Sequence, residues 1–335
     1  MKIIIIILIF LVVIPIILIT WHVIKLFKKP DFSKIPIYYP FKSEKAKIRY
    51  YEYYDKRSEE YPVKSETKYL TTSYGETFVR IFGDEKKSPL VLLPSANASS
   101  LIWLSNIKTL SENFRIYAVD NIYDVGRSVN SYPIISSDDL VNWLDELFTK
   151  LELSDNINLM GLSFGGWLTS QYALRFPNRL NKIILAAPVA TVIQLPAAWA
   201  YRAILGALPH RYFMKVFFVN WMFQNLVKKK DDNSIALLNK LIDDGLMVMK
   251  CYKFRMPLTP AVLTDIELQN FKIPVLFIVG ENEVIYPAKN AIQRLNSVAP
   301  NIKTEIIKDA SHDLTISQSE IFNNLVINFL NRNDK

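Results

Sequence analysis

A serine flanked by glycines follows one of the apolar runs of the sequence. Residues 161–166 read Gly-Leu-Ser-Phe-Gly-Gly and come directly after the run Ile157–Met160. The small glycines allow a sharp turn from strand to helix, so the hydroxyl of Ser163 projects away from the backbone. The helix expected next, Trp167–Phe176, points its free N–H groups at a developing oxyanion. The pattern predicts a nucleophilic serine.

A general base for this serine follows by elimination among three histidines. His22 lies in an apolar N-terminal segment, and His210 lies in a long insertion. His312 lies on a loop between the last expected strand, Glu305–Ile307, and the last expected helix, Ser319–Leu330. It therefore takes the third place in the chain order serine, acid, histidine. We expect His312 to be the general base.

The acid that orients the histidine is expected just past the strand Val275–Val279. This strand ends in Gly-Glu-Asn-Glu, residues 280–283. A carboxylate at that place can reach the histidine and hold its tautomer. We expect Glu283 to be this acid, with Glu281 as the alternative. The preceding strand end, 186–189, carries no acid.

From residue 76 onward, short apolar runs alternate with longer segments of helical character. Gly, Pro, Asn or Asp bound most of these runs, as is typical of parallel strands covered on both faces. The order predicts an α/β fold with a mostly parallel sheet and helices on both faces. The expected strands are Phe78–Phe82, Leu90–Leu93, Ile116–Val119, Ile157–Met160, Ile183–Ala187, Val275–Val279 and Glu305–Ile307, and the expected helices include Asp138–Leu151, Trp167–Phe176, Ala288–Val298 and Ser319–Leu330.

The alternation is interrupted between Ala187 and Val275. This stretch contains no clear core strand and includes two aromatic-rich pieces, Trp199–Leu208 and Tyr212–Leu226. An insertion of this size in an α/β sheet is typical of a cap over the active site. We expect a helical cap at about residues 190–268.

Several segments together resemble the α/β-hydrolase superfamily, over about residues 70–332. The chain is most similar to its capped, esterase-like members, in which the acid is usually Asp and Glu is a known variation. The resemblance implies hydrolysis of an ester, thioester or related acyl bond of a small molecule through an acyl-enzyme, without a metal or an organic cofactor. Relatives that dehalogenate alkanes or open epoxides use an Asp nucleophile, so Ser163 argues against both activities. The segments that carry the resemblance are Gly161–Gly166, Ala173–Pro177 with Arg179, Val119 and Asp120 with Gly126–Ser128, Gly280–Glu283, and Ala310–Asp313.

One loop departs from the family pattern. Relatives normally carry His-Gly after the strand that corresponds to Leu90–Leu93, whereas residues 94–97 here read Pro-Ser-Ala-Asn. The resemblance implies the N–H groups of Ala96 and Phe164 as the two oxyanion donors. Losing the glycine restricts the backbone, and losing the histidine removes a side chain that braces the loop. This change supports one alternative, a non-catalytic binding protein that keeps the fold; an acyltransferase with the same triad is the other.

The N-terminus contains an apolar run, Ile3–Ile19, that is long enough to cross a bilayer. We expect residues 1–29 to be a single-pass transmembrane anchor, with the lipid bilayer as a partner. Three lysines follow the run and one precedes it, which predicts that the catalytic domain lies on the cytoplasmic side, with the extracytoplasmic side as the alternative. A cleaved signal peptide is disfavoured because no A-x-A-like site follows.

The residues that follow, 30–68, are charged and rich in tyrosine and are expected to be a juxtamembrane segment. Within them, Glu44–Glu60 lacks Gly and Pro and predicts a helix, either a solvated spacer that packs partly on the main domain or, less favoured, a helix on the membrane surface. The hydrolase domain is then expected over 69–335.

Charge and cysteine content exclude other classes. Residues 1–68 hold 13 Lys or Arg and 7 Asp or Glu, so they carry six of the eight net positive charges, and the rest of the chain is close to neutral. This distribution predicts no nucleic-acid binding. With one cysteine, Cys251, and three histidines, the sequence offers no Cys/His cluster for a metal and no internal disulfide.

Overall fold

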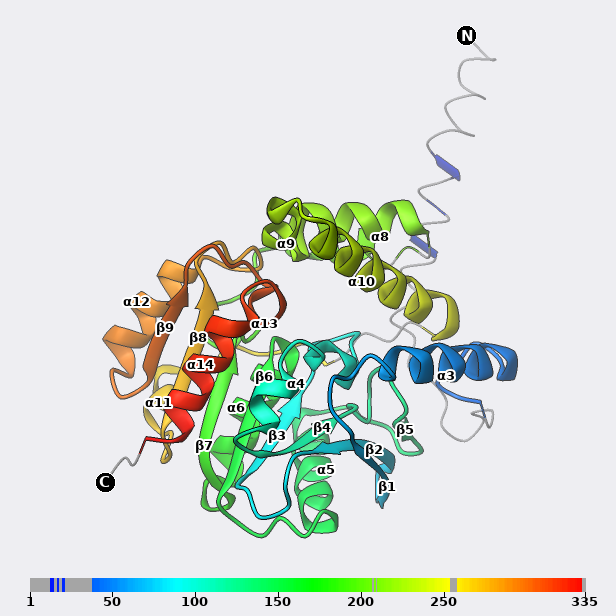
Figure 1. Ribbon diagram of the computed structural model, residues 1–335. Coiled ribbons are helices and arrows are strands. Elements are labelled where there is room, and N and C mark those ends of the chain that lie inside the picture. Colours follow the sequence, from blue (N-terminus) through cyan, green and yellow to red (C-terminus); the bar gives the residue numbers. More distant parts are fainter. Residues whose placement is uncertain are drawn as a thin grey trace.

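The chain is described by a computed structural model over residues 38–332 except 207, 209 and 254–257, together with residues 13, 14, 17, 20 and 21. The described residues form a nine-stranded sheet in the order β1-β2-β4-β3-β6-β7-β8-β9, with β5 paired to β2 (Figure 1). Neighbours among β3, β4 and β6 to β9 are parallel, whereas β2 pairs antiparallel with β1, β4 and β5. The strands are β1 (Glu66–Thr72), β2 (Gly75–Phe82), β3 (Pro89–Leu93), β4 (Arg115–Val119), β5 (Val129–Asn130), β6 (Ile157–Leu162), β7 (Leu180–Ala186), β8 (Val275–Gly280) and β9 (Lys303–Ile307).

The central strands send alternate side chains into two hydrophobic cores, one on each face of the sheet. In β3, Val91 and Leu93 join a core with α5, α6 and α12, whereas Leu90 and Leu92 join a core with α4 and α14. Both faces are covered, which explains why these strands are apolar throughout. The prediction of a mostly parallel sheet between two layers of helices is confirmed. The helices and short turns are η3 (Ser100–Trp103), α4 (Ile107–Ser111), α5 (Ser137–Lys150), α6 (Phe164–Arg175), η4 (Pro177–Arg179), α11 (Asp265–Gln269), α12 (Ala288–Val298), α13 (Leu314–Ser317) and α14 (Ser319–Leu330).

A group of helices lies over one end of the sheet, where the predicted cap was placed (Figure 1). These helices follow β7 and precede β8, and the longest of them, α10, packs against α8 and α9. Its N-terminus is capped because the side chain of Asp231 accepts a hydrogen bond from the N–H of Ser234. The elements are α7 (Ala198–Gly206), α8 (Arg211–Phe217), η5 (Phe218–Met222), α9 (Gln224–Lys229) and α10 (Asp232–Cys251).

The charged N-terminal segment supplies a helix that packs on the rest of the molecule. Helix α3 (Glu44–Ser58) contacts α10 of the cap. Its tyrosines Tyr50 and Tyr54 are buried in the same core as α4 and α14, and the ring of Tyr50 meets that of Tyr252 edge to face. Helix α3 is therefore part of the packed structure and joins the cap to the sheet domain.

The predicted membrane location needs correction. None of the described helices combines the length and the apolar character that crossing a bilayer requires. The predicted localisation, a single-pass membrane protein with a cytoplasmic catalytic domain, is therefore wrong, and the described helices give no support to the bilayer as a partner. Most of the predicted anchor, residues 1–29, lies outside the described residues.

Candidate active site

Ser163 lies in the turn between β6 and α6. Its φ of 55° is in the left-handed region, which is unusual for a residue with a side chain and is typical of strained functional turns. Three hydrogen bonds hold this backbone: the N–H of Ser163 donates to the carbonyl of Ala186 at 2.9 Å, and its carbonyl accepts from the N–H groups of Trp167 and Val189 at 3.0 and 3.2 Å. The turn is thus fixed from the next strand as well as from its own helix.

The glycines around Ser163 are required by close backbone contacts. A Cβ atom on Gly161 would lie 2.0 Å from the carbonyl oxygen of Gly165. A Cβ atom on Gly165 would lie 2.4 Å from the carbonyl oxygen of Leu93 and 2.6 Å from that of Pro94. Because real Cβ atoms do not approach this closely, the start of α6 presses directly on the loop after β3. The helix that begins after the predicted nucleophile is therefore in contact with the start of the predicted oxyanion loop.

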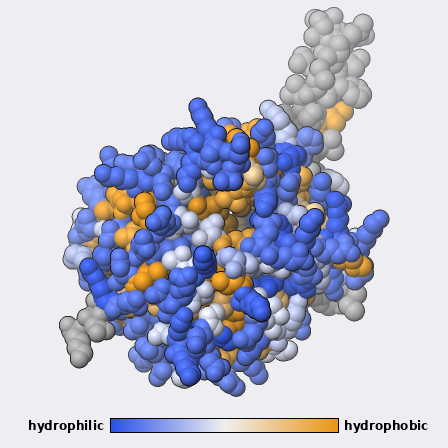
Figure 2. Space-filling model, viewed as in Figure 1, coloured by the Kyte–Doolittle hydropathy of each residue, from blue (hydrophilic) through white to orange (hydrophobic). Residues whose placement is uncertain are grey.

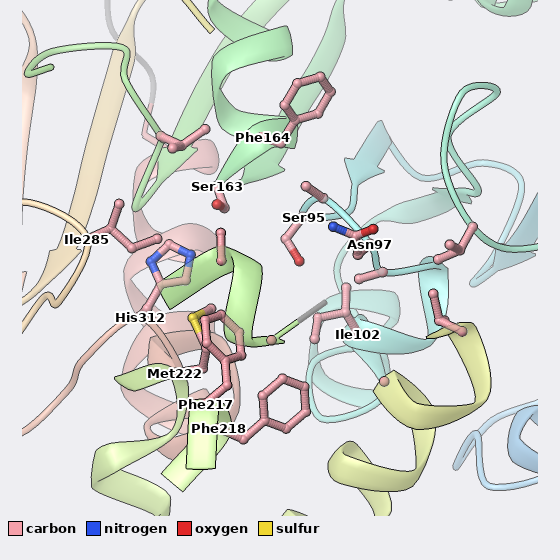
Figure 3. A pocket seen from close by; sticks show the side chains of 18 of the residues that line it. Ser95, Asn97, Ile102, Ser163, Phe164, Phe217, Phe218, Met222, Ile285 and His312 are labelled. Carbon is pink, nitrogen blue, oxygen red and sulfur yellow. The ribbon is translucent and has the colours of Figure 1, made fainter. Parts of the chain in front are cut away.

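His312 lies on the loop between β9 and α13 and is only 4% exposed. Its Nδ1 atom is 2.9 Å from Oε2 of Glu283. Its Nε2 atom is buried and makes no hydrogen bond within the described part of the chain. Ser163 and His312 line the same cavity, and the imidazole ring faces Ser163 (Figure 3). This leaves Nε2 as the atom able to accept a proton.

Glu283 is held in place by its own backbone neighbours. Its side chain is fully buried, and its Oε1 atom accepts hydrogen bonds from the N–H groups of Val284 and Ile285 at 2.8 and 2.9 Å. Oε2 is left for His312. The alternative acid, Glu281, is exposed and accepts from the N–H of Asp309 at 3.4 Å. The structure therefore brings Glu283, and not Glu281, to the histidine.

The residue after the histidine ties this loop to the cap. The Oδ1 atom of Asp313 accepts from the hydroxyls of Ser311 and Ser317 at 2.8 and 3.0 Å, and Oδ2 accepts from the N–H of Leu226 in α9 at 3.1 Å. Asp313 is buried. One carboxylate thus shapes the loop of His312 and anchors a cap helix, a role that no spacing in the sequence indicated.

The two predicted oxyanion donors have free N–H groups. Phe164 is the first residue of α6, so its N–H has no partner within the helix. The N–H of Ala96 donates to no other described residue. The loop is braced at the next residue, because the N–H of Asn97, which has a φ of 57°, donates to Oδ2 of Asp124 at 2.9 Å. Asp124 thus braces this loop, which has no His-Gly pair.

A cavity of about 610 Å³ opens beside Ser163. This volume suits a drug-sized molecule, and most of its wall is apolar. In Figure 3 two phenylalanine rings and a methionine of the cap lie below Ser163 and His312, and Figure 2 shows hydrophobic residues in the hollow below the cap. The cap residues labelled in this wall are Phe217, Phe218 and Met222.

Helix α3 supplies another part of the wall, through Tyr50 and Tyr53. The hydroxyl of Tyr53 donates to Oδ1 of Asp244 in α10 at 2.6 Å, and Arg57 donates to both oxygens of the same carboxylate at 2.8 and 2.9 Å. Burial and the Asp244 charge raise the pKa of Tyr53 above its ordinary value, so its hydroxyl stays a donor. This clamp holds α3 and α10 together at the cavity.

Comparison with known proteins supports the fold described above. A family model described as alpha/beta hydrolase fold matches residues 88–318, which is more than half of the chain. The chain belongs to the α/β-hydrolase family.

The similar members of this family include bacterial carboxylesterases. The carboxylesterase nap of Bacillus subtilis is 33% identical over 288 residues, which cover 85% of this chain and 93% of that protein. The carboxylesterase YbfK of the same organism is 31% identical and covers 87% of this chain and 96% of its own. The crystal structure of naproxen esterase from Bacillus subtilis superposes with a TM-score of 0.77 at 32% identity, covering 87% of this chain and 100% of that one. The fold extends over nearly the whole length of these relatives.

Proposed function

We propose that this α/β hydrolase cleaves carboxylic esters or thioesters of hydrophobic acyl groups through an acyl-enzyme on Ser163. At the coarser level, the chain is an ester-hydrolysing enzyme, like the two carboxylesterases of Bacillus subtilis that it resembles over most of its length. The nucleophile, the intermediate and the substrate class are the finer parts of the proposal.

The mechanism assigns one proton carrier and one charge-stabilising site. Nε2 of His312 takes the proton of the Ser163 hydroxyl while its oxygen attacks the acyl carbon. The N–H groups of Phe164 and Ala96 donate to the oxyanion that forms. His312 then gives its proton to the leaving alcohol. A water molecule attacks the acyl-enzyme by the same route, which releases the acid and restores the serine.

The observation that carries the proposal is the state of the two nitrogens of His312. Nδ1 is engaged by Glu283, and a carboxylate only accepts hydrogen bonds, so Nδ1 bears the proton. In the neutral imidazole Nε2 is then the acceptor, and it has no partner within the described residues although it is buried beside Ser163. A buried acceptor without a partner costs about 1–3 kcal/mol. Its retention supports a function that needs this atom free.

The cavity supports a hydrophobic acyl substrate. Its wall is made largely of aliphatic and aromatic side chains, and its volume of about 610 Å³ exceeds what an acetyl group needs. Removing apolar surface from water stabilises binding by about 25 cal/mol per Å², so longer acyl chains gain affinity until the cavity is filled.

The test is hydrolysis of p-nitrophenyl esters from acetate to decanoate by the purified protein, with Ser163→Ala as the control. We expect turnover by the wild-type chain, with kcat/KM rising with acyl length, and loss of turnover in Ser163→Ala. Product analysis with an added alcohol distinguishes free acid from a transesterified product, which would indicate an acyltransferase. A folded wild-type protein that cleaves none of these esters would contradict the proposal and favour a binding role.

A further inference from the structure

Ser95 presents a hydroxyl to the reaction centre. It occupies the position where relatives were expected to carry glycine, between Pro94 and the proposed oxyanion donor Ala96. Its side chain lines the same cavity as Ser163 and His312, and Figure 3 shows its hydroxyl pointing into that cavity. Within the described residues this hydroxyl makes no hydrogen bond, so it is available to a substrate.

The loop that carries Ser95 has a fixed position. The carbonyl oxygen of Ser95 accepts from the N–H of Ala98 at 3.2 Å, and the N–H of Asn97 is held by Asp124 at 2.9 Å. On the other side, the carbonyl of Pro94 presses on Gly165 at the start of α6. The residue directly before Ser95 therefore touches the helix that begins beside the nucleophile.

Ser95 and His312 lie on opposite sides of Ser163 (Figure 3). This is the arrangement that acyl transfer needs, because the base withdraws a proton on one side of the attacked carbonyl while donors stabilise its oxygen on the other. Ser95 directly precedes Ala96, one of the two proposed N–H donors, and lines the same cavity as Phe164, the other. A serine hydroxyl rotates to suit its acceptor, so it can donate to an oxygen placed between these two N–H groups.

The geometry points to the hydroxyl of Ser95 as a third hydrogen-bond donor to the oxyanion, which makes Ser95 a catalytic residue. This inference rests on the proposed ester hydrolysis. The hydroxyl donates its hydrogen bond and keeps its proton, so no bond is broken and no further reactant is needed. A hydrogen bond to a charged oxygen is about twice as strong as one to a neutral carbonyl, so the contribution is larger in the transition state than in the bound substrate. The hydroxyl thus adds a donor to a loop that has lost its His-Gly pair.

The test compares Ser95→Ala, which removes the donor, with Ser95→Thr, which keeps a hydroxyl at the same atom. We expect Ser95→Ala to lower kcat for a p-nitrophenyl ester about 10- to 100-fold with little change in KM. Ser95→Thr should retain kcat within a few-fold of the wild-type value. A trifluoromethyl ketone, which adds to a serine as a tetrahedral oxyanion, should bind Ser95→Ala more weakly by the same factor as the loss in kcat.

The outcomes separate this inference from the proposed function. An unchanged kcat in Ser95→Ala overturns the catalytic role while leaving ester hydrolysis intact. A rise in KM alone, with unchanged binding of the ketone, shows instead a contact with the bound substrate and also overturns it. Equal thermal unfolding midpoints of the two variants and the wild type exclude a folding defect as the cause. A wild-type protein without ester turnover overturns both the proposed function and this inference.

Discussion

The Nδ1 atom of His312 lies 2.9 Å from the Oε2 atom of Glu283, and the other oxygen of this carboxylate accepts two backbone N–H groups. A glutamate is longer by one methylene than the aspartate that is usual for the acid in this family. The hydrogen bonds from Val284 and Ile285 fold the side chain back onto its own loop and fix the oxygen that meets the histidine. The additional length is therefore accommodated by local backbone contacts.

Replacing Glu283 with Gln should lower kcat by about 10²- to 10⁴-fold, because an amide can present an N–H to Nδ1 and select the wrong histidine tautomer. The measurement is steady-state ester hydrolysis. Glu281→Gln is the matched control, since Glu281 is exposed and does not contact His312, and its kcat should stay within about two-fold. Equal losses in the two variants would contradict the assignment of Glu283.

Replacing Asp313 should lower the stability of the protein and loosen the attachment of the cap. In Asp313→Asn the amide places an N–H₂ group against the N–H of Leu226 or against the hydroxyl donors, so a buried hydrogen bond is lost. We expect the free energy of unfolding to fall by about 1–3 kcal/mol and KM to rise as α9 loosens. Urea unfolding and ester kinetics measure the two effects. The exposed Asp309→Asn should change the free energy of unfolding by less than about 0.5 kcal/mol, and a similar effect of both substitutions would refute the tether.

The clamp between α3 and α10 should stabilise the cavity wall. Arg57 is only 6% exposed and meets Asp244 through two hydrogen bonds. Arg57→Leu leaves this half-buried carboxylate without its counter-charge and should lower the free energy of unfolding by about 2 kcal/mol. The double variant Arg57→Leu with Asp244→Leu should recover part of that loss, because no unpaired charge remains. If the double variant is less stable than the sum of the single effects predicts, the clamp interpretation fails.

The carboxyl group of Asp120, which directly follows β4, predicts how the stability of the protein depends on pH. Burial raises the pKa of its carboxyl group above the ordinary value, although the N–H groups of Ser100 and Arg127 donate to it at 2.7 and 2.8 Å. A group with a raised pKa in the folded state contributes stability that is full below its unfolded pKa of about 3.9 and is lost as the pH rises through the folded value. Urea unfolding should therefore show that the free energy of unfolding of the wild type falls relative to that of Asp120→Asn between pH 4 and pH 7. A wild type that instead gains stability relative to Asp120→Asn as the pH rises would mean that the pKa of Asp120 is lowered in the folded state.

Much of the fold could be predicted from the sequence because the central strands are buried on both faces. Each of the seven predicted strands overlaps an observed one. Strand β1 was not predicted, since it is an edge strand with mostly exposed polar residues. The short β5 of two residues leaves no periodic pattern to recognise.

Some residues of the candidate site could be predicted from the sequence and others could not. Ser163, Glu283 and His312 could be predicted because strand ends and chain order place them together. Asp124 and Asp313 could not, because their roles depend on contacts with another loop and with the cap. The role of Ser95 could not, because it depends on the position of its hydroxyl in the folded cavity. The role of α3 at the cavity depends on a contact between Arg57 and Asp244, which are 187 residues apart. The predicted membrane anchor was inferred from hydropathy alone.

The most direct test of the central claim, an activated serine at position 163, is labelling of the purified protein with a fluorophosphonate probe. We expect stoichiometric labelling of the wild-type chain, none of Ser163→Ala, and much slower labelling of Glu283→Gln, whose histidine is no longer held in the productive tautomer. Mass spectrometry of the labelled peptide should place the adduct on Ser163. Absence of labelling in a well-folded wild type, or undiminished labelling of Ser163→Ala, would contradict the claim.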